Sequence, residues 1–352
     1  MEVLAEYGLF LAKLITFVVA ALIVIAIVIS AAHRSRQEED EGEIQVVRVN
    51  DRVRETRETL EASIQDEGAR KHWLKDLRRK RKREKKEAGS KAAKRAEDSR
   101  RKRLYVVDFQ GDIKASQTES LRRCVSAILS VADPQRDEVV VRLESAGGMV
   151  HSYGYAAAQL DRIRQRSLPL TASIDKVAAS GGYMMACVAD RIVASPFAIL
   201  GSIGVVAQLP NVHRLLKRND VDFEVLTAGE YKRTLTVFGE NTDKGRKKFR
   251  DDLEETHKLF KQYVNEHRPA VDIDRVATGE IWFGRQALEV NLADELKTSD
   301  ELLMDACNDR DVFLVRYEKR RTLPEKLGLT AATAAESVFM KGFEWLRYSR
   351  YQ

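Results

Sequence analysis

The chain has 352 residues, 44% of them hydrophobic, so it can bury the core of one large domain or of two ordinary ones. Its formal net charge of +6 would suit a nucleic-acid-binding protein, but the charge is unevenly distributed along the sequence. The three cysteines, Cys124, Cys187 and Cys307, are too few and too widely spaced for a disulfide framework or a cysteine metal cluster. We therefore expect a mostly globular protein with core thiols.

An uncharged apolar run covers residues 14–32 and follows a short leader at residues 1–13. A helix of this length crosses the hydrocarbon core of a bilayer, which is about 30 Å thick. A cleaved signal peptide is the alternative, because the small residues at 30–32 resemble a cleavage site. The run is longer than a signal-peptide core and the leader is acidic, so we favour a retained transmembrane anchor in the lipid bilayer.

Residues 33–103 are dominated by Glu, Arg and Lys, which predicts a charged, partly helical stalk. An arm that binds RNA or anionic lipid is the alternative, because polybasic segments attract phosphate groups. The basic run LKDLRRKRKREKKEAGSKAAKRAEDSRRKR contains no aromatic residue that could stack on a base. We therefore favour a solvated spacer with some lipid contact and no specific nucleic acid partner.

Short β-branched runs alternate with helical patterns from Leu104 onward, which predicts a single α/β domain over residues 104–318. The expected strands lie at residues 104–109, 138–145, 168–174, 191–195 and 222–229. The expected helices lie at residues 152–166, 178–190, 210–220 and 243–267, with a helix and a strand in residues 285–296. Residues 319–352 form a last amphipathic segment.

Ser180 lies between small residues, in Val-Ala-Ala-Ser-Gly-Gly-Tyr, after an expected strand and at the start of an expected helix. Small neighbours allow a substrate to approach closely, and the amides of a helix N-terminus stabilise developing negative charge. Ser180 is therefore a candidate nucleophile. The plainer interpretation is a helix N-cap beside glycines needed for packing.

Two further elements are candidates for the same site. The paired glycines Gly147 and Gly148 follow an expected strand and can present amides as an oxyanion hole, or can form a turn that needs positive φ. Lys232 lies in Thr-Ala-Gly-Glu-Tyr-Lys-Arg, directly after another apolar run. A lysine acts as a general base only when burial lowers its pKa from about 10.4 toward about 7, and an exposed loop lysine is the ordinary alternative.

The three elements together, in this order and spacing, resemble the signal peptide peptidase A family, in its SohB branch. The resemblance extends from Leu104 to Leu296 and includes TAGEYKRTLTVFGENTDKGRKKF and GEIWFGRQALEVNLADEL. The anchor and the charged stalk are similar as well. The resemblance implies a twisted-sheet α/β domain of the ClpP and crotonase type, preceded by the transmembrane helix and the stalk. It also implies a membrane-anchored serine endopeptidase that needs no cofactor and no metal.

The resemblance implies a role for individual residues. In that family the serine of AASGGY is the nucleophile and the lysine of the YK pair is the general base, which correspond here to Ser180 and Lys232. The oxyanion hole is formed by amides that correspond to Gly147 and Gly181. The serine of the GSIG segment, here Ser202, is expected to hydrogen-bond the catalytic lysine.

The resemblance also implies a mechanism. Neutral Lys232 takes the proton of Ser180, the alkoxide attacks a peptide carbonyl, and the amides hold the oxyanion. Lys232 then protonates the leaving amine, and water hydrolyses the acyl-enzyme. One residue departs from the family pattern, because Ala146 stands where Ser-Pro-Gly-Gly has proline. Alanine lacks the fixed φ of proline, so we expect a slightly looser loop with an intact oxyanion hole.

Other interpretations of the same residues stay open. His151 and Asp190 could complete a Ser-His-Asp triad, which we rank below the Ser-Lys pair, and Gly148 and His151 are weaker candidates for the substrate cleft. A crotonase-like acyl-CoA enzyme and a catalytically degenerate membrane scaffold are the alternative functions. The YK element and the anchor favour the peptidase over the CoA enzyme. The presence of both dyad residues argues against the scaffold.

Assembly and location follow from the resemblance alone. The family forms rings in which the cleft of one subunit borders the next, so we expect a homo-oligomer, by analogy an octamer. Its expected substrates are peptides such as signal-peptide fragments, and its expected location is the bacterial inner (plasma) membrane. Charges beside the span slightly favour a cytoplasmic catalytic domain, whereas the resemblance favours the exported side, which we adopt. Residues 319–352 could serve assembly, lie on the membrane or pack on the core.

Overall fold

The structure is a computed structural model that describes residues 42–66, 68–70, 72–73, 75–77, 79–80, 82–83 and 101–319. The expected membrane span and the C-terminal amphipathic segment beyond residue 319 lie outside these residues. Within the described residues, no helix has the length and hydropathy needed to cross a bilayer. The chain divides into two units: Val46–Arg316 is one, and the two chain ends, described only at Gly42–Gln45 and Tyr317–Lys319, are the other.

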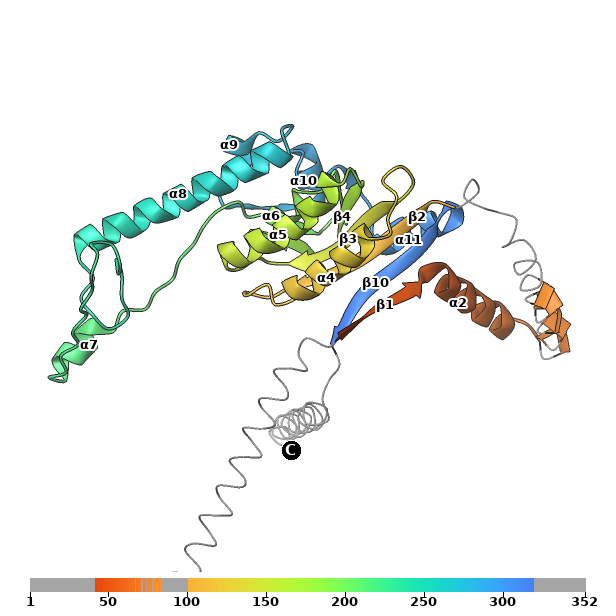
Figure 1. The fold of residues 1–352 in the computed structure, drawn as a ribbon, viewed down its shortest axis with the longest axis horizontal. Helices are drawn as coiled ribbons and strands as arrows, with labels where there is room; N and C mark the ends of the chain where they lie inside the picture. Colours follow the sequence, from red (N-terminus) through yellow and green to blue (C-terminus); the bar gives the residue numbers. More distant parts are fainter. Residues whose placement is uncertain are drawn as a thin grey trace, which may run out of the picture. The chain divides into compact units, whose positions relative to one another are not determined.

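The larger unit is built around a mostly parallel sheet (Figure 1). The strands are β1 (Gly42–Arg48), β2 (Arg103–Gly111), β3 (Glu138–Ser145), β4 (Leu170–Ile174), β5 (Val177–Ala179), β6 (Arg191–Ala194), β7 (Ile199–Gly201), β8 (Ile281–Phe283), β9 (Glu295–Leu296) and β10 (Asp311–Lys319). Their order is β1-β10-β2-β3-β4-β6-β9, and a branch of β5, β7 and β8 leaves the end of β3. The pairs from β10 to β9 are parallel, so their carboxyl ends meet at one edge of the sheet.

Helices connect the strands, as the alternating pattern of the sequence predicts. They are α2 (Val49–Ile64), α4 (Thr118–Leu129), α5 (Val150–Gln165), α6 (Gly181–Ala186), α7 (His213–Arg218), α8 (Asp243–His267), α9 (Ile273–Val276), α10 (Gly284–Glu289) and α11 (Ser299–Asp309). The α/β class and the helix at residues 243–267 are confirmed. The latter begins after Thr242, whose hydroxyl accepts the N–H of Gly245 at 3.1 Å, as an N-cap does.

The sheet has a hydrophobic core on both faces, because successive strand residues point to opposite sides. On one side a cluster joins strand residues to helix α11; it contains Leu104, Val106, Val140, Val312, Leu314, Leu303 and Ala306. On the other side the ring of Phe109 meets that of Tyr153 in α5, edge to face, at 6.5 Å. Burial on both faces explains why β2 and β3 are nearly continuous apolar runs.

One expected strand is wrong. Residues 222–229 form no strand and belong to the long segment between β7 and α8. The apolar residues that suggested a strand, Val225 and Leu226, are 42% and 90% exposed. A strand needs a neighbour for its backbone hydrogen bonds, and this segment has none beside it.

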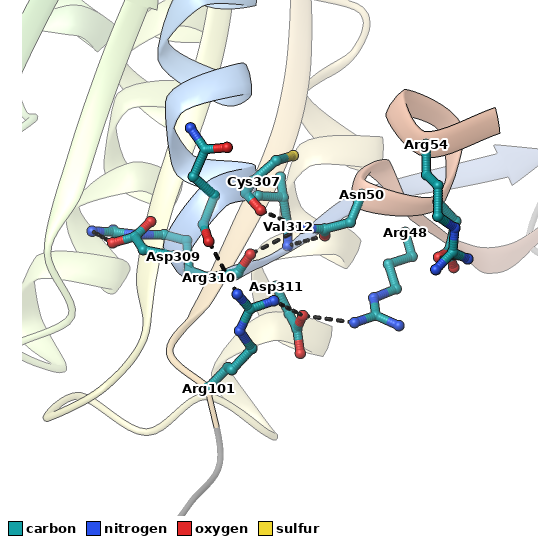
Figure 2. A network of polar contacts seen from close by, with 11 residues as sticks. Arg48, Asn50, Arg54, Arg101, Cys307, Asp309, Arg310, Asp311 and Val312 are labelled. Atoms are coloured by element: carbon teal, nitrogen blue, oxygen red, sulfur yellow. Dashed lines mark hydrogen bonds and ion pairs between the residues drawn. The ribbon is translucent and has the colours of Figure 1, made fainter. Parts of the chain in front are cut away.

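The stalk expectation has to be corrected for residues 42–64, which form β1 and α2. Asn50, at the start of α2, forms hydrogen bonds with the turn between α11 and β10 (Figure 2). Its amide nitrogen donates to the carbonyls of Cys307 and Arg310 at 3.2 and 3.0 Å, and its amide oxygen accepts the N–H of Val312 at 2.8 Å. Arg48 adds an ion pair with Asp311 at 2.7 Å. This part of the expected stalk therefore folds as a piece of the domain.

We expect Asn50→Ala to lower the free energy of unfolding by about 1 to 3 kcal/mol, because three backbone groups lose their partner. The matched control is Arg52→Ala on an exposed position of the same helix, which should stay within about 0.5 kcal/mol of the wild type. Denaturant unfolding of the three proteins is the measurement. Equal stability of Asn50→Ala and the control would show that the hydrogen bonds of Asn50 do not stabilise the packing of α2.

The C-terminal end of α8 is fixed to the sheet by Arg268. The buried guanidinium donates to both carboxylate oxygens of Asp294 at 2.8 and 2.7 Å and to the carbonyl of Asn291 at 2.9 Å. Asp294 also accepts the N–H of Ile192, in β6, at 2.7 Å. Burial raises the pKa of Asp294, but the hydrogen bonds from Arg268 and Ile192 outweigh it and hold this pKa below its ordinary value.

This lowered pKa predicts a loss of stability in acid. Asp294 stabilises the fold above its unfolded pKa of about 3.9, and the contribution disappears as the pH falls through the lower folded pKa. We expect Asp294→Asn to be less stable than the wild type near pH 7, with the gap closing toward about pH 2. Denaturant unfolding at both pH values measures it. A gap that does not change with pH would contradict this assignment.

Candidate active site

Ser180 occupies the turn between β5 and α6 with φ 51° and ψ −120°. Positive φ is uncommon for a residue with a side chain, and such strain persists only where the surroundings enforce it. Here the N–H of Ser180 donates to the carbonyl of Gly201 at 2.8 Å, next to the pairing of Ala179 with Gly201. Within the described residues nothing hydrogen-bonds to the Ser180 hydroxyl. A serine on a strained strand-to-helix turn is the arrangement of a nucleophile elbow.

The Gly-Gly turn after β3 touches this serine. Gly147 has φ 92°, and a Cβ atom there would lie 2.7 Å from the amide nitrogen of Gly181 and 2.8 Å from Cβ of Ser180. A Cβ on Gly182 would lie 2.4 Å from the carbonyl oxygen of Ser145. Glycine is therefore required at these positions by close approach. The structure brings Gly147, Ser180 and Gly181 together, as the sequence predicts.

The amides around Ser180 differ in whether they have an acceptor. The N–H of Gly147 donates to the hydroxyl of Ser145 at 3.1 Å, and that of Met149 donates to the carbonyl of Ile113 at 2.9 Å. In the part of the chain that the structure describes, the amides of Gly148 and Gly181 have no acceptor. Unbound amides beside a nucleophile are suited to stabilise an oxyanion.

Ser202 lies next to Ser180 on the neighbouring strand. Strands β5 and β7 are parallel with Ala179 opposite Gly201, so Ser180 and Ser202 follow at the same level. Ser202 also has positive φ, 48°, and its N–H donates to the carbonyl of Glu280 at 2.7 Å. Two strained serines therefore end adjacent strands.

Lys232 lies in the segment of residues 205–241, which joins β7 to α8 and contains α7. Its side chain is exposed, and within the described residues it forms no hydrogen bond or ion pair. The segment bonds to itself and to the first turns of α8: Val212 N–H donates to Val237, and Lys244 pairs with Glu230 at 2.6 Å. Figure 1 shows α7 at the N-terminal end of α8, well away from α6. The single chain does not bring Lys232 into contact with Ser180.

The residues of a Ser-His-Asp triad are not brought together. His151 is exposed in the first turn of α5. Asp190 accepts the N–H of Leu170 at 2.9 Å and the guanidinium of Arg164 at 3.0 Å. Leu170 begins β4, so Asp190 lies at the amino ends of the strands, opposite the edge that carries Ser180. These contacts give Asp190 a structural role that needs no part in catalysis.

Sequence reasoning missed the loop at residues 112–117, which borders the turn. A Cβ on Gly148 would lie 2.2 Å from the carbonyl oxygen of Ile113, so the loop and the turn are in contact. The side chains of Ile113, Met149 and Val150 are 69%, 41% and 44% exposed. In the sequence, the large apolar residues directly after Gly148 could have indicated an exposed apolar surface beside the turn. No group of three His, Cys, Asp or Glu residues in the described ranges is arranged to hold a metal ion.

Comparisons with known proteins confirm the family resemblance that the sequence indicates. The family profile described as Peptidase family S49 N-terminal matches residues 2–160, and that of Peptidase family S49 matches residues 162–312. A Haemophilus influenzae protein named "Probable protease SohB" is 47% identical over 96% of this chain and 95% of its own length. A protein of the same name from Buchnera aphidicola subsp. Acyrthosiphon pisum is 50% identical over 70% of this chain and 74% of its own.

A solved structure of a membrane-bound stomatin-specific protease in complex with a substrate peptide aligns with a TM-score of 0.40. The sequence identity is 14%, and the alignment covers 64% of this chain and 96% of that chain.

We expect Gly147→Ala to slow the reaction of Ser180 with a fluorophosphonate by about tenfold or more, because the new Cβ pushes the turn and its amides away from the serine. The matched control is Gly279→Ala. Gly279 also has positive φ, 86°, but its missing Cβ would point into open space. The rate of covalent labelling measures both variants. Equal slowing in both would mean that backbone strain, not the contact with Ser180, is responsible.

Proposed function

Because the chain belongs to peptidase family S49, we propose that it hydrolyses peptide bonds with Ser180 as nucleophile and Lys232 as general base, through an acyl-enzyme. The observation that carries the proposal is the strained Ser180 in close contact with the Gly-Gly turn, at a place where the amides of Gly148 and Gly181 have no acceptor among the described residues. Attack on a carbonyl creates an oxyanion, and preorganised N–H donors stabilise that charge. The ClpP and crotonase type of fold belongs to the same proposal.

The oxyanion hole is proposed to use the amide of Gly181 and an amide of the Gly-Gly turn. The sequence favoured Gly147 for the second donor. Its N–H already has an acceptor in Ser145, whereas that of Gly148 has none in the described residues. We therefore assign the second donor to Gly148. Gly147 then contributes its small size, which lets the turn reach Ser180.

Lys232 needs a surrounding that the single chain does not supply. A general base has to be neutral when it accepts a proton, and for lysine this requires loss of hydration. Lys232 is exposed, and its segment also exposes Val206, Leu226 and Phe223 at 80%, 90% and 47%. An exposed apolar segment is suited to pack on a second copy. The expected homo-oligomer is thus proposed to bury Lys232 beside the Ser180 and Ser202 of a neighbouring subunit.

The proposed substrates are short extended peptides with apolar side chains. The exposed side chains of Ile113, Met149 and Val150 form an apolar rim beside the free Gly148 amide. Apolar peptide side chains lose water on such a surface, which favours binding. Fragments of signal peptides fit this chemistry. We propose that the protein acts at the bacterial inner membrane, with the catalytic domain on the exported side and the ring of the family as its assembly.

The first test is hydrolysis of fluorogenic peptides by the full-length protein in detergent. We expect Ser180→Ala and Lys232→Ala each to reduce kcat by about a thousandfold or more, because each removes a partner of the acylation step. Lys176→Ala is the matched control for loss of an exposed lysine, and should retain activity. Near-normal turnover in Lys232→Ala would exclude it as the base and make His151 the next candidate. Hydrolysis of acyl-CoA thioesters but not peptides would favour the crotonase alternative.

The second test separates a base from the same chain from one of a neighbouring chain. Ser180→Ala and Lys232→Ala are dissociated, mixed and reassembled, so that mixed oligomers contain intact serines and lysines on different chains. We expect activity to return, up to about a quarter of the wild type if subunits mix at random. Pure variants treated in the same way are the controls. No recovery in demonstrably mixed oligomers would mean that one chain provides both groups.

A further inference from the structure

A buried chain of hydrogen bonds lies beneath the Gly-Gly turn and is not used by the reaction described above. The hydroxyl oxygens of Ser145 and Tyr153 are 2.6 Å apart, and the Tyr153 hydroxyl lies 2.8 Å from the carbonyl oxygen of Asp112. The hydroxyl of Ser145 also accepts the N–H of Gly147 at 3.1 Å. Ser145 is 2% exposed and Tyr153 is fully buried.

The direction of every hydrogen bond in this chain follows from counting protons. The carbonyl of Asp112 only accepts, so the single proton of the Tyr153 hydroxyl goes to it. The Ser145 hydroxyl must then donate its own proton to Tyr153, which leaves its lone pairs for Gly147. The order of donation is therefore Gly147, Ser145, Tyr153, Asp112. Burial raises the pKa of Tyr153, which outweighs the opposite effect of Ser145, so its phenol remains a donor.

The Ser145 and Tyr153 side chains are closely packed against glycine backbone. A Cβ on Gly111 would lie 2.3 Å from both the Ser145 hydroxyl and the Tyr153 hydroxyl. A Cβ on Gly181 would lie 2.4 Å from Cγ of the Tyr153 ring. The pair is thus enclosed by the end of β2 and the start of α6. Loss of the Ser145 hydroxyl would leave the Gly147 N–H without this acceptor, and loss of the Tyr153 hydroxyl would leave the proton of the buried Ser145 hydroxyl without this acceptor.

Tyr153 connects the three segments that build the site. Its hydroxyl binds the loop after β2 and, through Ser145, the turn after β3, while its ring supports the first residue of α6. The bond from Gly147 to Ser145 fixes the orientation of the peptide group that precedes the Gly147–Gly148 link. Because the position of an oxyanion donor has to be held within a fraction of an ångström, this fixation bears on the Gly148 amide.

We propose that Tyr153 and Ser145 are positioning residues that hold the Gly-Gly turn, and with it the Gly148 amide, in the geometry of the oxyanion hole. The inference rests on the proposed peptidase function for its consequence in catalysis. Both residues are buried and do not touch substrate, so they act only through the turn. Their loss should affect the stabilised transition state more than the binding of the peptide.

The test is Tyr153→Phe in the full-length protein, with Tyr183→Phe as the matched control. Tyr183 is equally buried and also donates to a backbone carbonyl, that of Leu292 at 3.2 Å. We expect Tyr153→Phe to lower kcat by about tenfold or more and to change KM by less than about threefold. Tyr183→Phe should keep both constants within about twofold of the wild type. Equal effects in the two variants would overturn the proposal.

A double-mutant cycle with Ser145→Ala tests whether the two hydroxyls act as one chain. If they do, the double variant should be hardly slower than the slower single variant, because either change already breaks the chain between Gly147 and the Asp112 carbonyl. Rate losses that multiply would mean that Tyr153 and Ser145 act separately, which would contradict the proposed chain.

Amide hydrogen exchange in the Gly-Gly turn tests the positioning role independently of catalytic activity. In Tyr153→Phe we expect faster exchange in peptides covering residues 144–149 than in the wild type or in Tyr183→Phe. Unchanged exchange would overturn the positioning role even if turnover fell. If wild-type turnover did not depend on Ser180, the proposed function would be wrong. Faster exchange in Tyr153→Phe would still support the role of Tyr153 and Ser145 in holding the Gly-Gly turn.

Discussion

The close approach of the turn after β3 to Ser180 is the constraint on which the candidate site depends. The two backbones come so near that a single Cβ on Gly147 would lie 2.7 Å from the Gly181 nitrogen. Ser180 has positive φ, and its N–H donates to the carbonyl of Gly201. This hydrogen bond fixes the position of Ser180 at the end of β5. The ends of β3, β5 and β7 thereby place Ser180 together with the amides of Gly148 and Gly181, which have no acceptor in the described part of the chain. Such preorganisation is what an acyl-transfer site requires, because donors already in place need not reorganise as charge develops.

The two halves of the proposed dyad differ in how the fold holds them. The Ser180 half stands directly at the end of strand β5 and at the start of α6, so the sheet fixes its position. The Lys232 half belongs to a segment that hydrogen-bonds to itself and to α8, and its apolar residues face solvent in the single chain. In this account assembly dehydrates the lysine and completes the site in the same step. A lone chain would carry a serine without its base, which limits hydrolysis to the assembled protein.

The sequence predicts the strands and helices around Ser180 well and the segment around Lys232 poorly, for physical reasons. Strands such as residues 138–145 and the helix at 243–267 carry strong periodic patterns, and the glycines at 147 and 181 indicate close backbone approach. Residues 222–229 carry a strand-like apolar pattern too, but the pattern cannot tell whether a neighbouring strand exists. The apolar side chains that suggested β structure are exposed there instead.

At residues 42–64 the charged composition predicted a stalk, although these residues form β1 and α2. The many charged residues of the whole range 33–103 concealed the strand and helix at its start. The contacts of Asn50 with the α11–β10 turn span more than 250 residues, and no local pattern reveals such pairing. The chain from Gly147 to Asp112 was likewise hidden, since it depends on the register that sets Gly111 opposite Ser145. Local sequence predicts where elements lie, whereas these links depend on which elements become neighbours.

The most direct test of the account is mass spectrometry and peptide mapping of the full-length protein trapped by acid during turnover of a slowly hydrolysed peptide ester. We expect an acyl group on Ser180, at a site completed only in the assembled protein. Turnover with the acyl group on another residue, or with no acylated protein at any time, would contradict it.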